Sequence, residues 1–522
     1  MFVLLLCISC NNNSKKNNES AKDASNEEIA NENSIVGNFS NQQTIKFDSA
    51  KIATFFSKYS QLNSIKKELD SFYHNRQYVY AWYEDNGLID QADNLFDHIQ
   101  NIGSEGVSDK LPYQKEFHEM MDDENKDSLN TDTEIMLTAQ YFVYAKNVWA
   151  GMSEKKTKSI DWYVPRKKIS YSLMLDSLVD GKDILKSPPV YRQYALLKNQ
   201  LKKYHSIKNA GGFPIITTIK KSLKKSDSSA LVATIKKWLF ISGDLPQNNG
   251  SNVFDDNLEI AVKKLQERFG LKVDGIIGNS LLKEMNEPIE VRMQQLVVNM
   301  ERSRWLPITV SSDYLLINIP EFKLHAYEHD SLLWSMDAVV GKPIHKTSIF
   351  SGKIKYVVFN PYWNVPNSIL QKEVLPGISR NKNYLEKQNM EWNDGKVRQK
   401  PGPTNSLGLV KFLFPNSYDI YLHDSPAKSL FDESSRAFSH GCIRLSNAEK
   451  MANYLLKNDT AWSAQKITTA MHLGTEQTVT VKKAETVFIV YFTAWVDAHG
   501  QLNFRKDLYS RDKRLAKMLL DN

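Results

Sequence analysis

The sequence predicts a multi-domain protein of the α+β class, in which helical domains precede a mostly β domain. Three observations lead to this prediction. The 522 residues are too many for one hydrophobic core, since a domain typically has roughly 150 residues. From about 47 to 223, apolar residues recur at helical spacing, as in "EIMLTAQYFVYAKNVWAGM". From about 313 they alternate with polar residues, as in "DYLLINIPEFKLHAYEHDSLLWSMDAVVG", which is typical of strands.

The composition fits globular domains and predicts no nucleic-acid partner. Hydrophobic residues make up 41% of the chain and aromatic residues 11%, which is enough to fill several cores. The formal net charge is only +7, and Lys and Arg are mixed with Asp and Glu. A protein that binds nucleic acid usually carries a massed basic stripe, which this sequence lacks.

The first residues predict export. The apolar run "MFVLLLCISC" ends at Cys10 and is followed by an Asn-rich polar stretch that could not bury a core. It resembles a bacterial lipoprotein signal at 1–9 with the lipid on Cys10, although no Lys or Arg precedes it and Cys7 stands where leucine is usual. A plain signal peptide or a frayed tail is the alternative. We therefore expect a protein of the periplasm or cell envelope, anchored to a membrane by Cys10 through a flexible tether at 10–45.

Two helical domains are predicted next. The segment 46–225 shows no cluster of titratable residues, so we expect a structural scaffold. In 226–290, the residues of "FDDNLEIAVKKLQERFGLKVDGIIGNSLLKEMN" place an apolar stripe on one helix that ends at Gly270. This arrangement resembles the small three-helix peptidoglycan-binding domain, and whether it binds glycan or packs internally stays open. A linker helix is expected at 291–312.

The mostly β domain is predicted at 313–482. Its first two strands are joined at "EHDS", and "KIKYVVFNPYWNVP" is a further strand that ends at prolines. An insertion at about 368–405 is expected to be helical and then loop-like. The last segment, 483–522, is expected to be one more hairpin, with "AHGQ" at its tip, and a tail.

Cys442 is the candidate for chemistry. The other two cysteines lie within the first ten residues, so an exported chain leaves Cys442 without a disulfide partner, and a multi-cysteine zinc site is excluded. No metal or cofactor is expected. A buried core cysteine or a nucleophile remains, and a nucleophilic thiol needs a base because only the thiolate attacks. His423, at the end of the strand "SYDIYLHD", is the expected base, because His440 is too close in sequence to point at the thiol.

The backbone beside Cys442 is a candidate oxyanion site. Gly441 permits a tight turn, and successive N–H groups in such a turn can bind an anion. The N–H groups of His440, Gly441 and Cys442 are therefore the expected donors to a developing oxyanion.

The stretch "HDSPAKSLFDESSRAFSHGCIR" resembles the signature of the L,D-transpeptidase catalytic domain. His423 is followed, after fifteen residues, by Ser439, His440, Gly441 and Cys442. Arg444 stands where many members have Asn, which resembles the large multi-domain branch of Gram-negative envelopes. That branch has a scaffold, a peptidoglycan-binding domain and an insertion that caps the active site. The segments "VVGKP", "NPYWNVP", "KPGPTNSLGLVKFLFPN" and "FTAWVDAHGQLNFRKDLYSRD" are similar to it as well.

The resemblance implies an L,D-transpeptidase that forms 3→3 cross-links in peptidoglycan. Cys442 would attack the third residue of a donor tetrapeptide stem, D-Ala would leave, and an acceptor stem would resolve the thioester. His423 would be the general acid and base, and His440 and Gly441 would shape the loop and the oxyanion hole. Carbapenems would acylate the thiol. Other cell-wall synthesis proteins are expected as further partners.

The remaining site residues follow from the same resemblance. Tyr421 and Trp363 would wall the donor site, Arg444 would bind a stem carboxylate, and Ser439 would position a histidine. Core packing is the alternative for the two aromatic residues, and a loop brace is the alternative for Arg444. An L,D-carboxypeptidase or cysteine peptidase acting on stem peptides is the alternative function, and a non-catalytic wall-binding lipoprotein would need no dyad.

Overall fold

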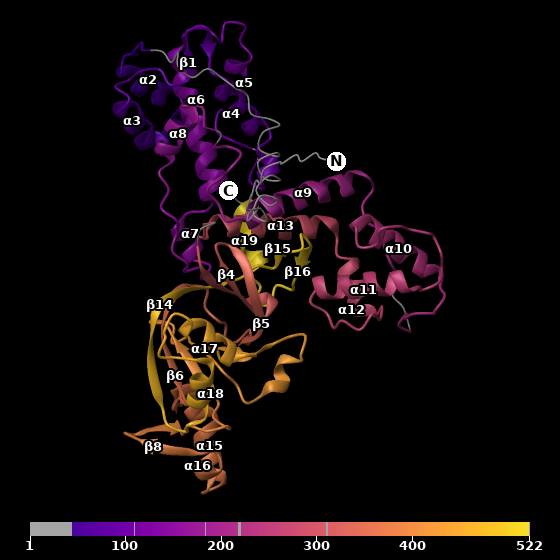
Figure 1. Cartoon of the computed structure of the whole chain (residues 1–522). Coiled ribbons are helices and arrows are strands. Elements are labelled where there is room, and N and C mark those ends of the chain that lie inside the picture. The colour runs from indigo at the N-terminus through magenta and orange to yellow at the C-terminus, as the bar shows by residue number, and fades with distance from the viewer. Residues whose placement is uncertain (1–43, 109, 183, 218–220, 310–311, 521–522) are drawn as a thin grey trace, which may run out of the picture. The chain divides into compact units, whose positions relative to one another are not determined.

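The computed structural model describes residues 44–520 except 109, 183, 218–220 and 310–311. The predicted signal, Cys10 and nearly all of the tether lie outside the described residues. The chain forms two compact units (Figure 1). Of the described residues, one unit contains those in 44–97, 115–139 and 172–185, and the other contains those in 98–114, 140–171 and 186–520. The candidate catalytic residues all belong to the second unit.

The segment predicted as a scaffold is helical, apart from a short hairpin of β1 and β2. Its amphipathic stretches bury residues such as Phe55, Phe72 and Tyr141, which confirms the helical periodicity. The elements are α2 Ala50–Lys58, η2 Ser60–Ile65, α3 Lys66–Asn75, β1 Tyr83–Glu84, β2 Gly87–Leu88, α4 Asp90–Gln100, η3 Ile102–Glu105, α5 Gln114–Met121, α6 Thr131–Tyr144, η4 Ala145–Ala150, α7 Glu154–Lys158, α8 Tyr171–Val179 and α9 Gln193–Asn209.

A three-helix bundle follows, as predicted. It consists of α10 (Ala230–Ser242), α11 (Asp256–Arg268) and α12 (Asn279–Met285). The side chain of Asp255 caps α11 by accepting the Leu258 N–H at 2.9 Å, and the predicted stripe on α11 is buried. One face of the bundle packs on the rest of its unit, where Arg505 donates to the Arg268 carbonyl at 2.6 Å.

A helix lies where the linker helix was predicted, α13 (Ile289–Arg304), and its second half is buried. Glu301 and Arg304 are almost fully buried and form an ion pair of 2.7 Å. Arg304 also donates to the carbonyls of Val148 at 2.7 Å and Glu105 at 2.6 Å. Glu301 and Arg304 of "NMERSRWLP" therefore bond to each other and to backbone inside the fold.

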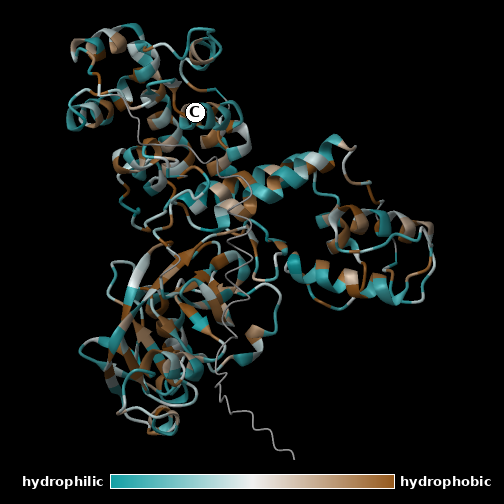
Figure 2. Cartoon of the chain, turned by 45° about the horizontal axis from the view of Figure 1, so that its top comes forward, coloured by the Kyte–Doolittle hydropathy of each residue, from teal (hydrophilic) through white to brown (hydrophobic). Residues whose placement is uncertain are grey.

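The mostly β domain is built on one nine-stranded sheet with the order β12-β5-β13-β11-β10-β6-β14-β3-β4. Because β4 pairs with β5 as well as with β3, the sheet closes on itself. Hydrophobic residues line its interior (Figure 2), and α17 (Ala448–Leu456) and α18 (Ala464–His472) pack on it. The strands are β3 Tyr314–Asn318, β4 Lys323–Glu328, β5 Ser331–Gly341, β6 Ser351–Phe359, β10 Val410–Leu413, β11 Leu422–His423, β12 Ala437–Ser439, β13 Ile443–Leu445 and β14 Gln477–Val490.

The insertion has more order than predicted. It begins as helices, but its expected loop-like half is a three-stranded sheet of order β7-β9-β8. The missed signal is "MEWNDGKVRQ", in which Asp394 and Gly395 both take positive φ and form a hairpin turn. Val365, Val374 and Val397 form a small separate core. The elements are β7 Trp363–Asn364, α14 Asn367–Ile369, η6 Leu370–Val374, α15 Leu375–Arg380, α16 Tyr384–Lys387, β8 Met390–Asn393 and β9 Lys396–Gln399.

The C-terminal segment is only partly the predicted hairpin. Strands β15 (Ala494–Val496) and β16 (Leu502–Phe504) form it, and helix α19 (Arg511–Leu520) follows. However, the boundary expected at 482 falls inside β14, which pairs with β3 and β6 in the nine-stranded sheet up to Val490. The alternating pattern on both sides of residue 482 belongs to one long strand. In the described part of the chain, no helix has the length and apolarity that crossing a membrane requires.

Candidate active site

The site arises where the short strands β11 and β13 pair in parallel. Leu422 lies opposite Ile443, and both side chains are fully buried in the core. Side chains alternate along a strand, so their neighbours share the other face of the sheet. The residues that come together in this way are Tyr421, His423, Cys442 and Arg444.

The Cys442 thiol is half-buried and protonated at neutral pH. The thiol donates to the carbonyl oxygen of Asp419 at 3.6 Å, and Tyr421 lies beside it. Burial raises the pKa of the thiol, while Tyr421 and the charge of Arg444 offset part of that rise. The thiol therefore needs a base before it can attack.

His423 has the protonation state of such a base. Its imidazole is 4% exposed, and Nδ1–H donates to the backbone carbonyl of Asp424 at 2.5 Å. Burial and then the positive charge of Arg444 lower the pKa of His423 to about 4. The ring is thus neutral at pH 7, with Nε2 unprotonated. Among the described residues, the thiol has no direct hydrogen bond to His423.

Asp424, which sequence analysis did not single out, fixes the segment that carries the base. Its carboxylate accepts the Leu409 N–H at 3.0 Å and the ammonium of Lys428 at 2.6 Å. Gly408, at a φ of +65°, allows this approach, because a Cβ there would lie 2.3 Å from the Asp424 carboxylate. The sequence signal for this contact was the pair of segments "NSLG", which ends at Gly408, and "HDSP", which contains Asp424.

Ser439 organises the loop that carries the nucleophile. Its hydroxyl accepts the Gly441 N–H at 3.1 Å and donates to the Cys442 carbonyl at 2.5 Å. Ser439 is buried, and both hydrogen bonds of its hydroxyl lie within this loop. It therefore does not position a histidine, which is the role that sequence analysis had predicted. Gly441 has a φ of +123°, which the turn requires.

The same bonds correct the expected oxyanion donors. The Gly441 N–H is already used by Ser439, so it does not point free into the site. Within the described part of the chain, the N–H groups of His440 and Cys442 donate to no protein acceptor. They remain available to a developing oxyanion.

His440 faces the insertion instead of the thiol. Its Nε2 lies 3.7 Å from the Glu373 carboxylate of η6, and its ring lies 4.8 Å from that of His345. Partial burial and then His345 lower the pKa of His440. The expectation that His440 is not the base agrees with this placement.

Arg444, Tyr421 and Trp363 surround the thiol. The Nε of Arg444 is buried without a hydrogen-bond partner, and no ion pair to Arg444 occurs among the described residues. Tyr421 lies beside Trp363 as well as Cys442, and burial raises the pKa of its hydroxyl. Trp363 lies on β7 opposite Gln399 of β9, so the three-stranded sheet of the insertion holds it in place.

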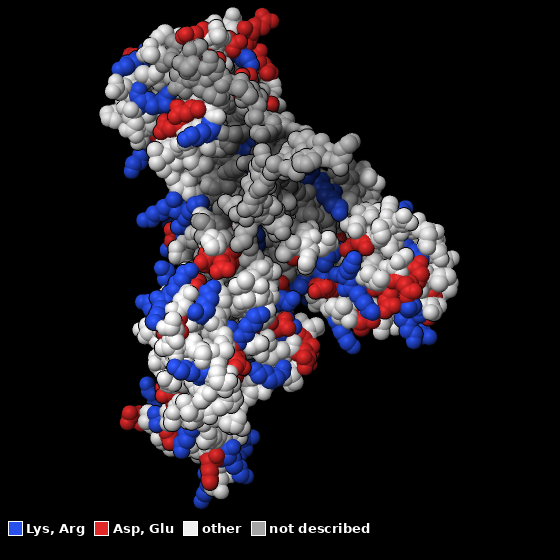
Figure 3. All heavy atoms as spheres, viewed as in Figure 1, with Lys and Arg blue, Asp and Glu red and all other residues white. Residues whose placement is uncertain are grey.

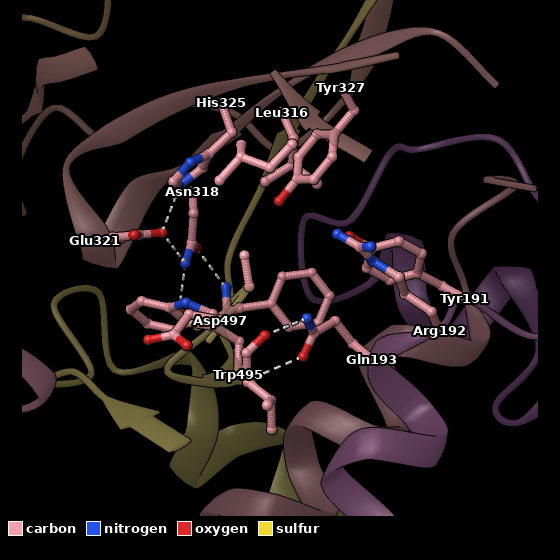
Figure 4. Close-up of a pocket in the computed structure, with 14 residues that line it drawn as sticks. Tyr191, Arg192, Gln193, Leu316, Asn318, Glu321, His325, Tyr327, Trp495 and Asp497 are labelled. Atoms are coloured by element: carbon pink, nitrogen blue, oxygen red, sulfur yellow. Dashed lines mark hydrogen bonds and ion pairs between the residues drawn. The ribbon is translucent and has the colours of Figure 1, made fainter. Parts of the chain in front are cut away.

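A separate pocket of about 70 Å³ lies elsewhere in the same unit (Figure 4). Its polar groups bond to each other: His325 contacts Glu321 at 3.0 Å, and Gln193 exchanges two hydrogen bonds with the backbone of Val496. None of the predicted site residues lines it. On the face shown in Figure 3, basic and acidic side chains are interspersed. No cluster of three or more potential metal ligands occurs among the described residues.

Comparison with known families matches three parts of the chain. Residues 312–479 match the L,D-transpeptidase catalytic domain, 67–201 match a scaffold domain, and 228–285 match a domain described as "Putative peptidoglycan binding domain". The chain therefore carries these three domains. Its candidate residues Cys442 and His423 lie within the first of them.

Individual relatives carry the same description. The chain is 30% identical over 243 residues to a "Putative L,D-transpeptidase" of Haemophilus influenzae, a match that covers 42% of this chain and 49% of the relative. The chain thus spans about half the length of this curated relative. Among solved structures, it is similar to an L,D-transpeptidase from Xylanimonas cellulosilytica (14% identity, TM-score 0.18, 52% of this chain and 100% of that one). It is also similar to an L,D-transpeptidase from Stackebrandtia nassauensis (13% identity, TM-score 0.23), a match that covers 51% of this chain and 97% of that one.

Proposed function

We propose that this chain, which carries an L,D-transpeptidase catalytic domain, cross-links peptidoglycan by forming 3→3 bonds between stem peptides. One observation supports this most directly. The pairing of β11 with β13 places a neutral imidazole and a protonated thiol on one face of the sheet, with free backbone N–H groups beside them.

The first half-reaction is an acyl transfer to sulfur. Nε2 of His423 accepts the Cys442 proton as the sulfur attacks the carbonyl of the third stem residue, meso-diaminopimelate. The N–H groups of Cys442 and His440 stabilise the oxyanion. When the tetrahedral intermediate collapses, the imidazolium gives its proton to the departing amine of D-Ala, and a thioester remains.

The second half-reaction regenerates the enzyme. The side-chain amine of an acceptor stem attacks the thioester, His423 accepts a proton from that amine, and Cys442 leaves as a thiolate that takes the proton back from the imidazolium. Arg444, whose Nε has no protein partner, binds a stem carboxylate, and Tyr421 and Trp363 hold the donor stem.

The other domains support the same substrate. The three-helix bundle holds the enzyme on peptidoglycan, and the lipid on Cys10 anchors it in the cell envelope. Other cell-wall synthesis proteins act beside it there.

Product analysis tests the proposal. Purified protein incubated with a disaccharide-tetrapeptide should yield a cross-linked dimer that has lost one D-Ala, read by mass spectrometry. Cys442→Ala should yield none, while Cys442→Ala and wild type should unfold at similar temperatures. If tripeptide appears without dimer, the enzyme is an L,D-carboxypeptidase. If cleavage occurs within the stem, it is a cysteine peptidase.

A carbapenem gives an independent check of the nucleophile. Intact-mass spectrometry should show one covalent adduct on the wild-type protein and none on Cys442→Ala. A wild-type protein that gains no mass would contradict the proposed thiol chemistry.

A further inference from the structure

Thr347, a residue that sequence analysis did not single out, holds the carbonyl beside the nucleophile. It is fully buried, and its hydroxyl donates to the Gly441 carbonyl at 2.8 Å. The same oxygen accepts the Gly341 N–H at 2.9 Å, so both of its hydrogen-bonding roles are used. Thr347 therefore ties the nucleophile loop to the end of β5.

The turn from Gly341 to Thr347 exists because residue 341 is glycine. A Cβ at Gly341 would lie 2.1 Å from the His345 carbonyl and 2.9 Å from the Thr347 N–H nitrogen. Strands β12 and β13 both pair with the end of β5, with Ser439 opposite Gly341 and Arg444 opposite Val339. The nucleophile loop thus passes around the end of β5, at the place where Thr347 returns.

Tyr509, from the C-terminal segment, completes this support. Its hydroxyl donates to the Gly341 carbonyl at 2.6 Å and accepts the Thr347 N–H at 3.3 Å. Tyr509 is 3% exposed, and its own N–H donates to the Tyr491 hydroxyl at 2.7 Å. A residue far along the chain therefore fixes both ends of the Gly341–Thr347 turn.

The orientation of one peptide group connects these bonds to chemistry. In a trans peptide the C=O and the following N–H point in opposite directions. The Gly441–Cys442 peptide is trans, so holding the Gly441 carbonyl on Thr347 fixes the direction of the Cys442 N–H. That N–H is one of the two free donors beside the thiol.

We propose that Thr347 and Tyr509 are positioning residues that orient the Gly441–Cys442 peptide so that its N–H meets the oxyanion formed on the attacked carbonyl. The inference rests on the proposed acyl transfer to Cys442. Neither residue touches substrate, and each acts through the loop.

The test separates oxyanion stabilisation from thiol reactivity. Acylation by a carbapenem forms an oxyanion, whereas alkylation by iodoacetamide displaces iodide at a saturated carbon and forms none. Thr347→Val should slow acylation on the order of 10-fold to 100-fold, as expected for a displaced donor, and should change the alkylation rate by less than about 2-fold. Both rates can be followed by intact-mass spectrometry on the full chain.

Three further variants provide a rescue, a test of the second positioning residue and a control. Thr347→Ser restores the hydroxyl and should recover acylation to within about 5-fold of wild type. Tyr509→Phe keeps the ring and removes the hydroxyl, so it should slow acylation about 5-fold to 10-fold. Tyr83→Phe is the matched control, because it removes a hydroxyl that donates to the Lys126 carbonyl at 3.1 Å in the other unit.

Three results would overturn the inference. Thr347→Val and Tyr509→Phe could acylate as fast as wild type, or could lose acylation and alkylation equally, which would indicate damage to the thiol or the fold. If the wild type alkylates at Cys442 but is never acylated, the proposed function fails, and the inference fails with it.

Discussion

At the scale of single residues, the protonation states of Cys442 and His423 decide how the thiol is activated. Burial raises the pKa of the thiol and lowers that of the imidazole to about 4. The neutral pair is therefore favoured over a preformed thiolate–imidazolium pair. In the proposed mechanism, proton transfer accompanies attack, so His423 must be neutral to accept the proton of the Cys442 thiol.

The pH dependence of acylation follows from this. His423 loses its function only when it is protonated, which happens as the pH falls through about 4 and not through the usual histidine value near 6.5. Carbapenem acylation, timed by mass spectrometry from pH 4 to 8, should keep most of its rate down to about pH 5. An acid limb centred near 6.5 would contradict a buried, neutral base.

Arg444 should also affect the pH dependence of acylation. Its charge is the second cause, after burial, that lowers the pKa of His423. Arg444→Met removes that charge, so the acid limb of acylation should move to higher pH, and KM for the tetrapeptide donor should rise. Arg380→Met, at an exposed position on α15, is a matched control and should leave the profile in place.

The sequence indicated the two residues proposed to react but not the hydrogen bonds that support them. His423 and Cys442 could be proposed because their residue types and spacing fit the chemistry. Ser439, Thr347 and Asp424 act through hydrogen bonds to backbone atoms of distant segments, and no local pattern encodes such partners. The Gly441 N–H was expected to be free for that reason, although Ser439 occupies it.

At the scale of elements, the insertion should respond to its own small core. Val397 is fully buried against Val365 and Val374 in that core. Val397→Ala leaves a cavity and should destabilise the insertion by about 2 kcal/mol. Limited proteolysis should cut 368–405 faster, while the unfolding temperature of the nine-stranded sheet stays the same. If the insertion resists proteolysis equally in the wild type and in Val397→Ala, the idea that it has its own core is contradicted.

The turn at Gly341 gives a second prediction at this scale. Gly341→Ala brings a methyl group against the His345 carbonyl, so it should displace the turn and slow acylation of Cys442 about 10-fold or more. Gly278→Ala, where no atom lies within 4 Å of the added Cβ, should be tolerated. Acylation rates and thermal unfolding of both variants check this, and a Gly341→Ala protein with the wild-type rate would refute it.

Element types were more predictable than element limits. The α+β class and the hairpin at "EHDS" follow from periodicity, which local sequence carries. The insertion's β8–β9 hairpin was missed because short strands with few apolar residues look like loops, although Asp394 and Gly395 marked the turn. The extent of β14 depends on its partners β3 and β6, which lie far away in sequence.

At the scale of the whole molecule, α13 brings charges into the second unit that must stay paired. Glu301→Ala leaves Arg304 buried without its carboxylate, so it should lower the free energy of unfolding of that unit by about 3–5 kcal/mol. Glu290 lies on the same helix, and Glu290→Ala, which breaks an exposed ion pair with Lys208 of α9, should have a much smaller effect. Denaturant unfolding measures both, and equal small effects would show that the buried pair is not needed.

The closure of the nine-stranded sheet affects how the protein behaves when it is crowded. Among the described strands of that sheet, only β12, which has three residues, pairs with a single neighbour. Unpaired strand edges are where β proteins add further chains and aggregate. Because β4 is covered on both sides, this sheet offers almost no template for such growth when molecules gather at high local density.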